Sequence, residues 1–202
     1  MLLQIMQDPA HAHLQEDFMK ERKSGMQERK GSRRHRRTGN GESTKGLRRE
    51  KETTLSHEKE SWNPGNLLYP LPAVMVSCQR PGEKPNIITL AWAGTICSSP
   101  AMVSISIRPE RHSYGIIKET REFVINLVNR ELTYATDYCG VKSGRDVDKF
   151  KEMNLTPLYS DTAAAPSIKE GPVNIFCRVT QVIPLGSHDV FLAEVTGITV
   201  DK

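Results

Sequence analysis

Six apolar runs rich in β-branched residues constrain the fold of this chain more than any other feature. They lie at residues 72–78, 86–92, 101–107, 122–128, 172–183 and 190–200. Such runs, bounded by Pro, Gly, Asn and Ser, are typical of strands. Short helices are predicted at 113–120, 131–140 and 145–153, but strands and helices do not alternate regularly. We therefore expect a mainly β fold with α insertions, a closed or partly closed antiparallel barrel, rather than a doubly wound sheet.

The chain before these runs has a different composition. Residues 1–60 hold half of the 28 Lys and Arg but fewer than half of the 24 Asp and Glu, so the net charge of +4 belongs to them. They show no sustained apolar period and bury too little surface to offset their ordering entropy. We expect residues 1–60 to be a disordered basic tail and residues 61–202 to form the folded domain.

The basic tail suggests a nucleic-acid partner, because clustered Arg neutralises phosphates. However, no aromatic residue lies between Phe18 and Trp62 on which a base could stack. We therefore interpret the tail as a solvated extension, or as the product of a start codon placed too far upstream, and expect no nucleic-acid partner. The opening MLLQIM is too short for a secretory signal, and no run of about 18 apolar residues exists. We expect a cytoplasmic protein without membrane contact.

Several motifs that carry chemistry are absent from the sequence. There is no G-x-G-x-x-G after a strand, no P-loop, no H-E-x-x-H and no G-x-S-x-G. The four cysteines, Cys78, Cys97, Cys139 and Cys177, include no C-x-x-C pair, so we expect no metal site and no dithiol motif. Cys177 falls on the apolar face of its run and is predicted to be a buried, inert thiol.

The stretch 92-WAGTICSSP-100 lies between two predicted strands and contains almost no side chain large enough to fill a core. We predict a loop here. Residues as small as Ala93, Gly94 and Ser98 are useful where something other than protein lies against the backbone. The loop is therefore a candidate ligand contact.

The stretch 101-AMVSISIRPERHSYG-115 follows this loop directly. Alternation puts Val103, Ile105 and Ile107 on the core face of a strand, and Ser104, Ser106 and Arg108 on the other face. We predict that Ser113 caps a helix beginning at Tyr114, whose free N–H groups would favour a phosphate with Arg111 as the opposing charge. An ordinary helix start with two solvated arginines is the alternative.

A second candidate is the turn in 138-YCGVKSGRDVDKF-150. Gly140 is predicted to end one helix and Asp146 to start the next, so that Lys142, Ser143 and Arg145 project from the turn. The turn is either a second phosphate contact or a plain connection between helices.

Several separated segments together resemble the flavin reductase-like family of FMN-binding split barrels, and most closely its flavoredoxin branch. They are 70-PLPAVMVSC-78, the run from Pro85 to Leu127, 137-DYCGVKSGRDVDKF-150 and 186-GSHDVFLAEV-195. The resemblance covers about Trp62 to Lys202. It implies a Greek-key split barrel that binds FMN without covalent attachment, usually as a homodimer with the flavin near the subunit interface.

The resemblance also assigns roles to residues of this chain. The loop would lie along the isoalloxazine ring, which Asn86, Thr89 and Trp92 approach from the preceding strand and His188 approaches from the turn 186-GSHD-189. The ring-side loop residues are Ala93, Gly94, Thr95, Cys97 and Ser98, and the phosphate-side residues are Arg108, Arg111, Ser113, Tyr114, Lys142 and Ser143. Ser187 stands where many flavin reductases have Asp, so the resemblance leaves the nicotinamide preference open.

The implied function is that of a flavin-dependent oxidoreductase. It would pass reducing equivalents from a nicotinamide nucleotide or a redox protein to free flavin, a metal complex or a protein acceptor. Cys97 and His188 are the candidate catalytic residues, although Cys97 could equally fill space or tune the flavin. The alternative is a non-catalytic barrel that holds flavin or haem. Family members continue beyond the last predicted strand, so we expect this chain to lack a C-terminal segment.

Overall fold

The computed structural model describes residues 59–202, so all but the last two residues of the expected tail lie outside the described part. Within this range no helix is both long and apolar enough to cross a bilayer. Three helices are described: α3 (His112–Thr120), α4 (Thr133–Val141) and α5 (Lys149–Glu152). The strands are β1 (Val74–Cys78), β2 (Asn86–Leu90), β3 (Ala93–Ser98), β4 (Ala101–Ile107), β5 (Glu122–Asn126), β6 (Pro157–Ser160), β7 (Ala163–Ile168), β8 (Val173–Pro184) and β9 (Asp189–Val200).

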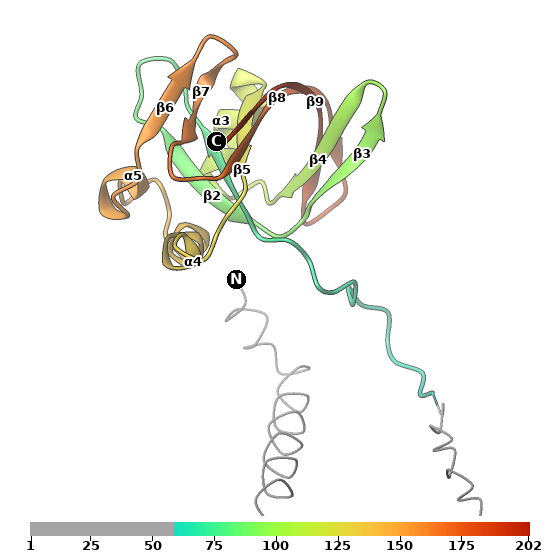
Figure 1. Cartoon of the computed structure of the whole chain (residues 1–202). Helices are drawn as coiled ribbons and strands as arrows, with labels where there is room; N and C mark the ends of the chain where they lie inside the picture. Colours follow the sequence, from blue (N-terminus) through green and yellow to red (C-terminus); the bar gives the residue numbers. More distant parts are fainter. Residues whose placement is uncertain (1–58) are drawn as a thin grey trace, which may run out of the picture. The chain divides into compact units, whose positions relative to one another are not determined.

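Seven strands form one antiparallel sheet in the order β2-β1-β5-β8-β9-β4-β3. Its two edge strands, β2 and β3, are consecutive in the chain, with only Ala91 and Trp92 between them. In a flat sheet these edges would be about 29 Å apart, whereas so short a connection spans at most about 11 Å. The sheet therefore curls into a barrel that is not closed between β2 and β3 (Figure 1). This confirms the expected split antiparallel barrel.

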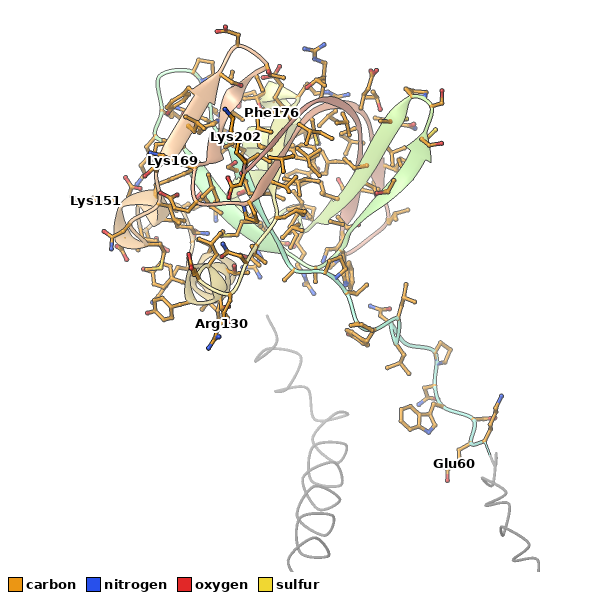
Figure 2. The ribbon with its side chains drawn as sticks, viewed as in Figure 1. Glu60, Arg130, Lys151, Lys169, Phe176 and Lys202 are labelled. Atoms are coloured by element: carbon orange, nitrogen blue, oxygen red, sulfur yellow. The ribbon has the colours of Figure 1, made fainter. Side chains whose placement is uncertain are left out.

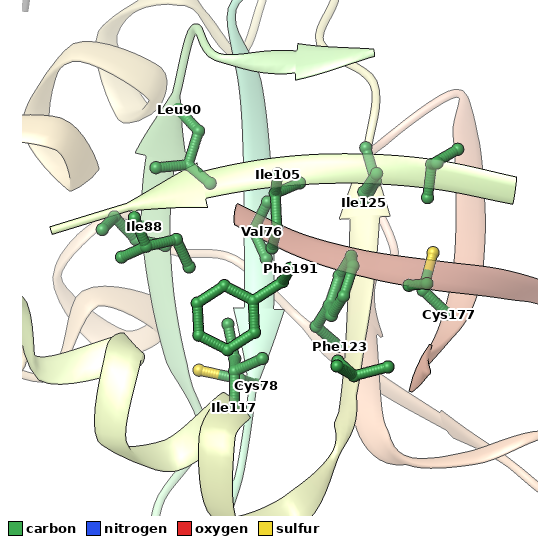
Figure 3. Close-up of a cluster of buried hydrophobic side chains, with 14 of the residues drawn as sticks. Val76, Cys78, Ile88, Leu90, Ile105, Ile117, Phe123, Ile125, Cys177 and Phe191 are labelled. Atoms are coloured by element: carbon green, nitrogen blue, oxygen red, sulfur yellow. The ribbon is translucent and has the colours of Figure 1, made fainter. Parts of the chain in front are cut away.

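The inside of the barrel is filled by alternate residues of the curled strands and by one face of α3. Val76 and Cys78 of β1, Phe123 of β5 and Phe191 of β9 meet Ile117 of α3 in this core (Figure 3). Charged side chains such as Lys151 and Lys169 instead project outward from the ribbon (Figure 2). The alternation predicted for β4 is confirmed, since Val103, Ile105 and Ile107 are buried. Cys177 is buried in the same core, as predicted.

A second core lies on the outer side of β1 and β2, which are buried along their whole length. Met75 and Ile87 face outward from these two strands. They pack against residues of α4, α5 and the segment after α5, namely Leu132, Ala135, Cys139, Phe150 and Leu155. The two short helices are thereby held against β2, next to the split in the barrel.

The hairpin of β6 and β7 did not follow from the sequence. Its segment contains three consecutive alanines and two prolines, which have low strand propensity. Side-chain hydrogen bonds from the main sheet hold it instead: Ser77 Oγ donates to the Pro166 carbonyl at 2.6 Å, and Asn126 Oδ1 accepts from the Ile168 N–H at 2.8 Å. The partners lie far apart in the chain, so no local pattern reveals them.

Candidate functional site

The small-residue segment after Trp92 is a strand, and the predicted loop is wrong. β3 pairs with β4 from Ala93↔Ile105 to Ser98↔Ala101, with a bulge between Thr95 and Cys97. Hydrogen bonding to β4 stabilises the extended backbone despite the low strand propensity of Ala, Gly and Ser. Since β3 ends the sheet, it has only one strand neighbour.

The small size of these residues leaves one face of β3 open. A Cβ atom added to Gly94 would meet no atom within 4 Å. Thr95, Ile96 and Ser98 are exposed, and Cys97 is partly exposed. A flat ligand can therefore approach the backbone of β3 without displacing protein atoms.

An aromatic contact lies at the start of this strand. The rings of Trp92 and His188 have centroids 4.3 Å apart at an interplanar angle of 40°. Trp92 is held because its carbonyl accepts a hydrogen bond of 2.9 Å from the Ser106 N–H. His188 belongs to the turn between β8 and β9, and Ser187 Oγ lies 3.0 Å from its Nδ1. The fold thus joins two residues that are 96 positions apart.

Burial lowers the pKa of His188, and the positive charges of Arg108 and Arg111 lower it further. Both arginines have exposed side chains at the end of β4 and the start of α3. The Trp92–His188 pair therefore lies within electrostatic range of two guanidinium groups. Since this pKa lies below its ordinary value, the neutral form of the His188 ring, in which only one nitrogen carries a proton, predominates at pH 7.

The start of α3 differs from the prediction. The helix begins at His112 with Arg111 as its N-cap, and no side chain caps its first turn. The predicted cap by Ser113 is wrong, because Ser113 is already inside the helix and buried. The Tyr114 N–H donates to the Arg111 carbonyl at 3.0 Å, but no side chain caps the positive end of the helix dipole, which favours an anion.

The buried side chain of Asn86 connects this helix start to the turn that follows α4. Its Nδ2 donates a hydrogen bond of 2.8 Å to Ser113 Oγ. Its Oδ1 would lie 2.0 Å from a Cβ atom on Gly144, so Asn86 fits only because Gly144 has no side chain. The two candidate phosphate contacts of the sequence are therefore neighbours in the fold.

A second contact joins the same two segments. Arg145 Nη2 donates to the Glu110 carbonyl at 3.3 Å, and the Arg145 N–H donates to Ser143 Oγ at 3.2 Å. Lys142 is the exposed C-cap residue of α4. Lys142 and Ser143 thus lie in a turn that is bound to the start of α3.

The predicted helix boundaries around this turn are wrong by one to three residues. α4 continues past Gly140 to Val141. The next helix starts after Asp148 rather than at Asp146, because the Asp148 side chain accepts a hydrogen bond from the Lys151 N–H. The turn is therefore longer than the sequence indicated.

Two of the predicted cofactor contacts make hydrogen bonds within the protein. Thr89 is buried and donates from Oγ1 to the Thr136 carbonyl at 2.5 Å. Tyr114 donates from its hydroxyl to Asp189 Oδ2 at 2.6 Å, and its ring meets the edge of Phe191. Both hydroxyl groups are therefore engaged within the protein.

Cys97 and His188, the two candidate catalytic residues, are not brought together. His188 precedes Asp189, which pairs with Ile107 of β4, whereas Cys97 pairs with Met102 of the same strand, about 16 Å away at roughly 3.3 Å per residue. Cys97 has a free thiol. The thiols of Cys78, Cys139 and Cys177 are also free, and burial raises their pKa values to about 12, about 11 and about 12.

The sequence did not identify two further titratable residues near the start of α3, His112 and Lys149. Burial lowers the pKa of His112, and the positive charges of Arg145 and Arg80 lower it further. Lys149 is buried behind the same region. Lys149 stands alone between Asp148 and Phe150, so no local pattern marks it out.

Comparison with known proteins identifies a family that matches this chain. The family described as flavin reductase like domain matches residues 67–202. An uncharacterized protein of Archaeoglobus fulgidus is 33% identical over 132 residues, which cover 65% of this chain and 73% of that protein.

Two solved structures are similar in both fold and sequence. The flavoredoxin of Desulfovibrio vulgaris (Miyazaki F) superposes with a TM-score of 0.67 at 32% identity, covering 72% of this chain and 78% of the other. The flavoredoxin of Methanosarcina acetivorans gives a TM-score of 0.66 at 27% identity, covering 72% of this chain and 76% of the other.

Proposed function

Because this chain belongs to the flavin reductase-like split-barrel family, in its flavoredoxin branch, we propose that it is an FMN-binding oxidoreductase. It passes reducing equivalents from a nicotinamide nucleotide or a redox protein to free flavin, a metal complex or a protein acceptor. Membership of the family supports flavin-related electron transfer. The identity of the flavin as FMN, and the classes of electron donor and electron acceptor, are what we propose beyond this.

The proposal rests on the open, small-residue face of β3 and on the arginines at the start of α3, which the Trp92–His188 pair links because Arg108 and Arg111 act on the ionisation of His188. A flavin mononucleotide has this same division, with a flat apolar ring system and a charged phosphate. The residues of this chain therefore fit the cofactor at both ends. The flavin supplies the electron-transfer chemistry, and the protein binds and orients it.

The ring end is formed by β3 and by the Trp92–His188 pair. Backbone N–H groups near Gly94 are the candidate donors to the ring, since no side chain there holds it away. Cys97 and Ser98 extend this face toward the end of β3. Uncharged His188 is proposed to exchange a proton at Nε2, because Ser187 Oγ lies against its Nδ1.

The phosphate end is formed by the first turn of α3 and by the 142–145 turn. Arg111 and Lys142 are the proposed charged contacts, and Ser143 a polar one. Asn86 and Ser113 hold the two segments in register. Charge-assisted hydrogen bonds from such groups favour a phosphate over a neutral alcohol.

We also propose that the protein acts as a homodimer. β3 is an edge strand with the exposed apolar side chain of Ile96, and a second copy that covers it would remove both the open edge and the exposed apolar surface. Sedimentation of the flavin-loaded protein tests this part of the proposal. A monomer at all concentrations would contradict it.

The functional test is spectroscopic. The full chain, purified and saturated with FMN, is mixed anaerobically with NADH or NADPH, and the visible flavin absorbance is followed before an acceptor is added. We expect bound flavin to be reduced by at least one donor and reoxidised by the acceptor over many cycles. Flavin that binds but is never turned over, with nicotinamides or with reduced redox proteins, would instead identify a storage module.

A further inference from the structure

Lys149 is the most deeply buried cation among the described residues. It begins α5, and only 3% of it is exposed. Its Nζ donates to the Ile87 carbonyl of β2 at 2.7 Å and to the Cys139 carbonyl of α4 at 2.8 Å. The ammonium group therefore lies between the edge of the barrel and the last turn of α4, whose dipole favours a positive charge.

No negative charge of the described part of the chain balances this ammonium group. Residues 59–202 contain no carboxylate at ion-pair distance from Lys149, although buried lysines are normally paired. The groups that face it are the thiols of Cys78 from β1 and Cys139 from α4, the guanidinium of Arg111, and the imidazole of His112, whose pKa is lowered by burial. Both thiols have raised pKa values and are neutral at pH 7.

The uncompensated charge lies directly behind the proposed phosphate end. Ile87, which accepts one hydrogen bond, follows Asn86, and Asn86 touches both Ser113 and Gly144. Cys139, which accepts the other, lies in the last turn of α4, just before Lys142. Arg111 is close enough to influence the ionisation of Lys149.

We propose that Lys149 is a buried binding cation of the phosphate end, stabilising a bound phosphate monoester from behind the surface contacts. This inference rests on the proposed function, since the phosphate that it describes is that of FMN. The phosphate supplies the negative charge that the protein lacks. Lys149 in turn strengthens phosphate binding. Because it is shielded from solvent, salt screens its charge only weakly.

Coupling between the Lys149 ammonium group and the phosphate predicts a direction for the change in proton binding, which can be measured. Burial lowers the pKa of Lys149 to about 8, with a smaller lowering by Arg111 and an opposing effect of the two thiols. A nearby phosphate favours the charged form, so its binding raises this pKa and takes up protons above pH 8. FMN affinity should fall roughly tenfold between pH 7 and 9.5 if the phosphate raises the pKa by about one unit.

Calorimetry of the wild-type protein tests the coupling. FMN and riboflavin are titrated into the full-length apoprotein at pH 8.5, in two buffers whose ionisation enthalpies differ. We expect FMN binding to take up a fraction of a proton and riboflavin binding to take up none. The phosphate itself contributes nothing, because its second pKa is about 6.

A pair of variants then assigns the coupled proton. Lys149→Met keeps the length and removes the charge, whereas Lys151→Met removes an exposed lysine from the same helix (Figure 2). We expect Lys149→Met to lower FMN affinity at pH 7 about tenfold or more, to leave riboflavin affinity unchanged and to abolish proton uptake. Lys151→Met should behave like the wild type.

The outcomes separate this inference from the proposed function. A wild-type protein that binds no FMN at any pH contradicts both. FMN binding without proton uptake, or with equal uptake for riboflavin, overturns the role of Lys149 alone. If Lys149→Met does not fold, the wild-type calorimetry still decides between these results.

Discussion

The hydroxyl of Tyr114 donates a 2.6 Å hydrogen bond to Oδ2 of Asp189, and this bond joins the two ends of the candidate site. Tyr114 lies in the first turn of α3, and Asp189 begins β9, directly after His188. The Asp189 carboxylate is buried, so it depends on this donor. The position of the His188 turn is therefore tied to the helix whose start is the proposed phosphate contact.

Tyr114→Phe should destabilise the protein by about 1–3 kcal/mol, because it leaves a buried acceptor without its donor while keeping the ring packed on Phe191. Urea unfolding measures the change in the free energy of unfolding. Lys118→Met is the control, since Lys118 Nζ reaches the same hydroxyl only from the exposed side, at 3.2 Å. Equal losses in the free energy of unfolding of the two variants would show that the bond to Asp189 stabilises the protein no more than the contact with Lys118 does.

Two glycines should respond in opposite ways to alanine. Gly144→Ala puts a Cβ atom 2.0 Å from Asn86 Oδ1, so it should break the Asn86–Ser113 bond and lower both stability and FMN affinity. Gly94→Ala meets no atom within 4 Å, so it should leave thermal stability nearly unchanged and weaken flavin binding only. Unchanged flavin affinity in Gly94→Ala would contradict a ring lying against β3.

The pKa of His188 should move in opposite directions when Arg108 and Glu110, two of its charged neighbours, are replaced one at a time. Burial and Arg108 lower this pKa, whereas Glu110 raises it. Arg108→Ala should therefore raise the pKa of His188, because the charged imidazole loses a repulsive neighbour, and Glu110→Gln should lower it. NMR titration of the ring protons measures both shifts. Shifts of the same sign would mean that structural change, rather than charge, controls this histidine.

Cys97 and His188 should act independently. Because they lie beside opposite ends of β4, about 16 Å apart at roughly 3.3 Å per residue, the effects of Cys97→Ser and His188→Ala on turnover should add within about 0.5 kcal/mol. Cys97→Ser keeps the size of the side chain, so the flavin should be retained with a moderate loss of rate. A double variant no slower than His188→Ala alone would indicate that the two residues share one step.

The parts of the fold that were predictable are those in which burial leaves a local pattern. β4 alternates between core and surface, and β8 and β9 are long apolar runs, so their positions follow from composition. β3 and the β6–β7 hairpin could not be predicted, because hydrogen bonds to distant strands outweigh their weak local strand propensity. The strand character of β3 is a property of the whole sheet.

The candidate site was only partly predictable for the same reason. Its charged residues lie in recognisable segments. The hydrogen-bond partner of Ser113, however, is Asn86, which is 27 residues away, so the local sequence alone favours a capping role for Ser113. No local pattern predicts the burial of Lys149, since its hydrogen-bond acceptors are carbonyls of β2 and α4. Sequence thus indicated candidate segments, and tertiary contacts determine how their side chains are placed.

The most direct test of the proposed site compares FMN with riboflavin, which differ only in the phosphate. Equilibrium titration of the apoprotein gives the affinity ratio for the wild type, Arg111→Ala, Lys142→Ala and Arg130→Ala, where Arg130 is an exposed arginine next to α4 (Figure 2). We predict that Arg111→Ala and Lys142→Ala each weaken FMN binding by about 1.5–3 kcal/mol, with little effect on riboflavin or in Arg130→Ala. Equal losses for FMN and riboflavin would show that these side chains do not bind the phosphate and would contradict the proposed orientation of the flavin.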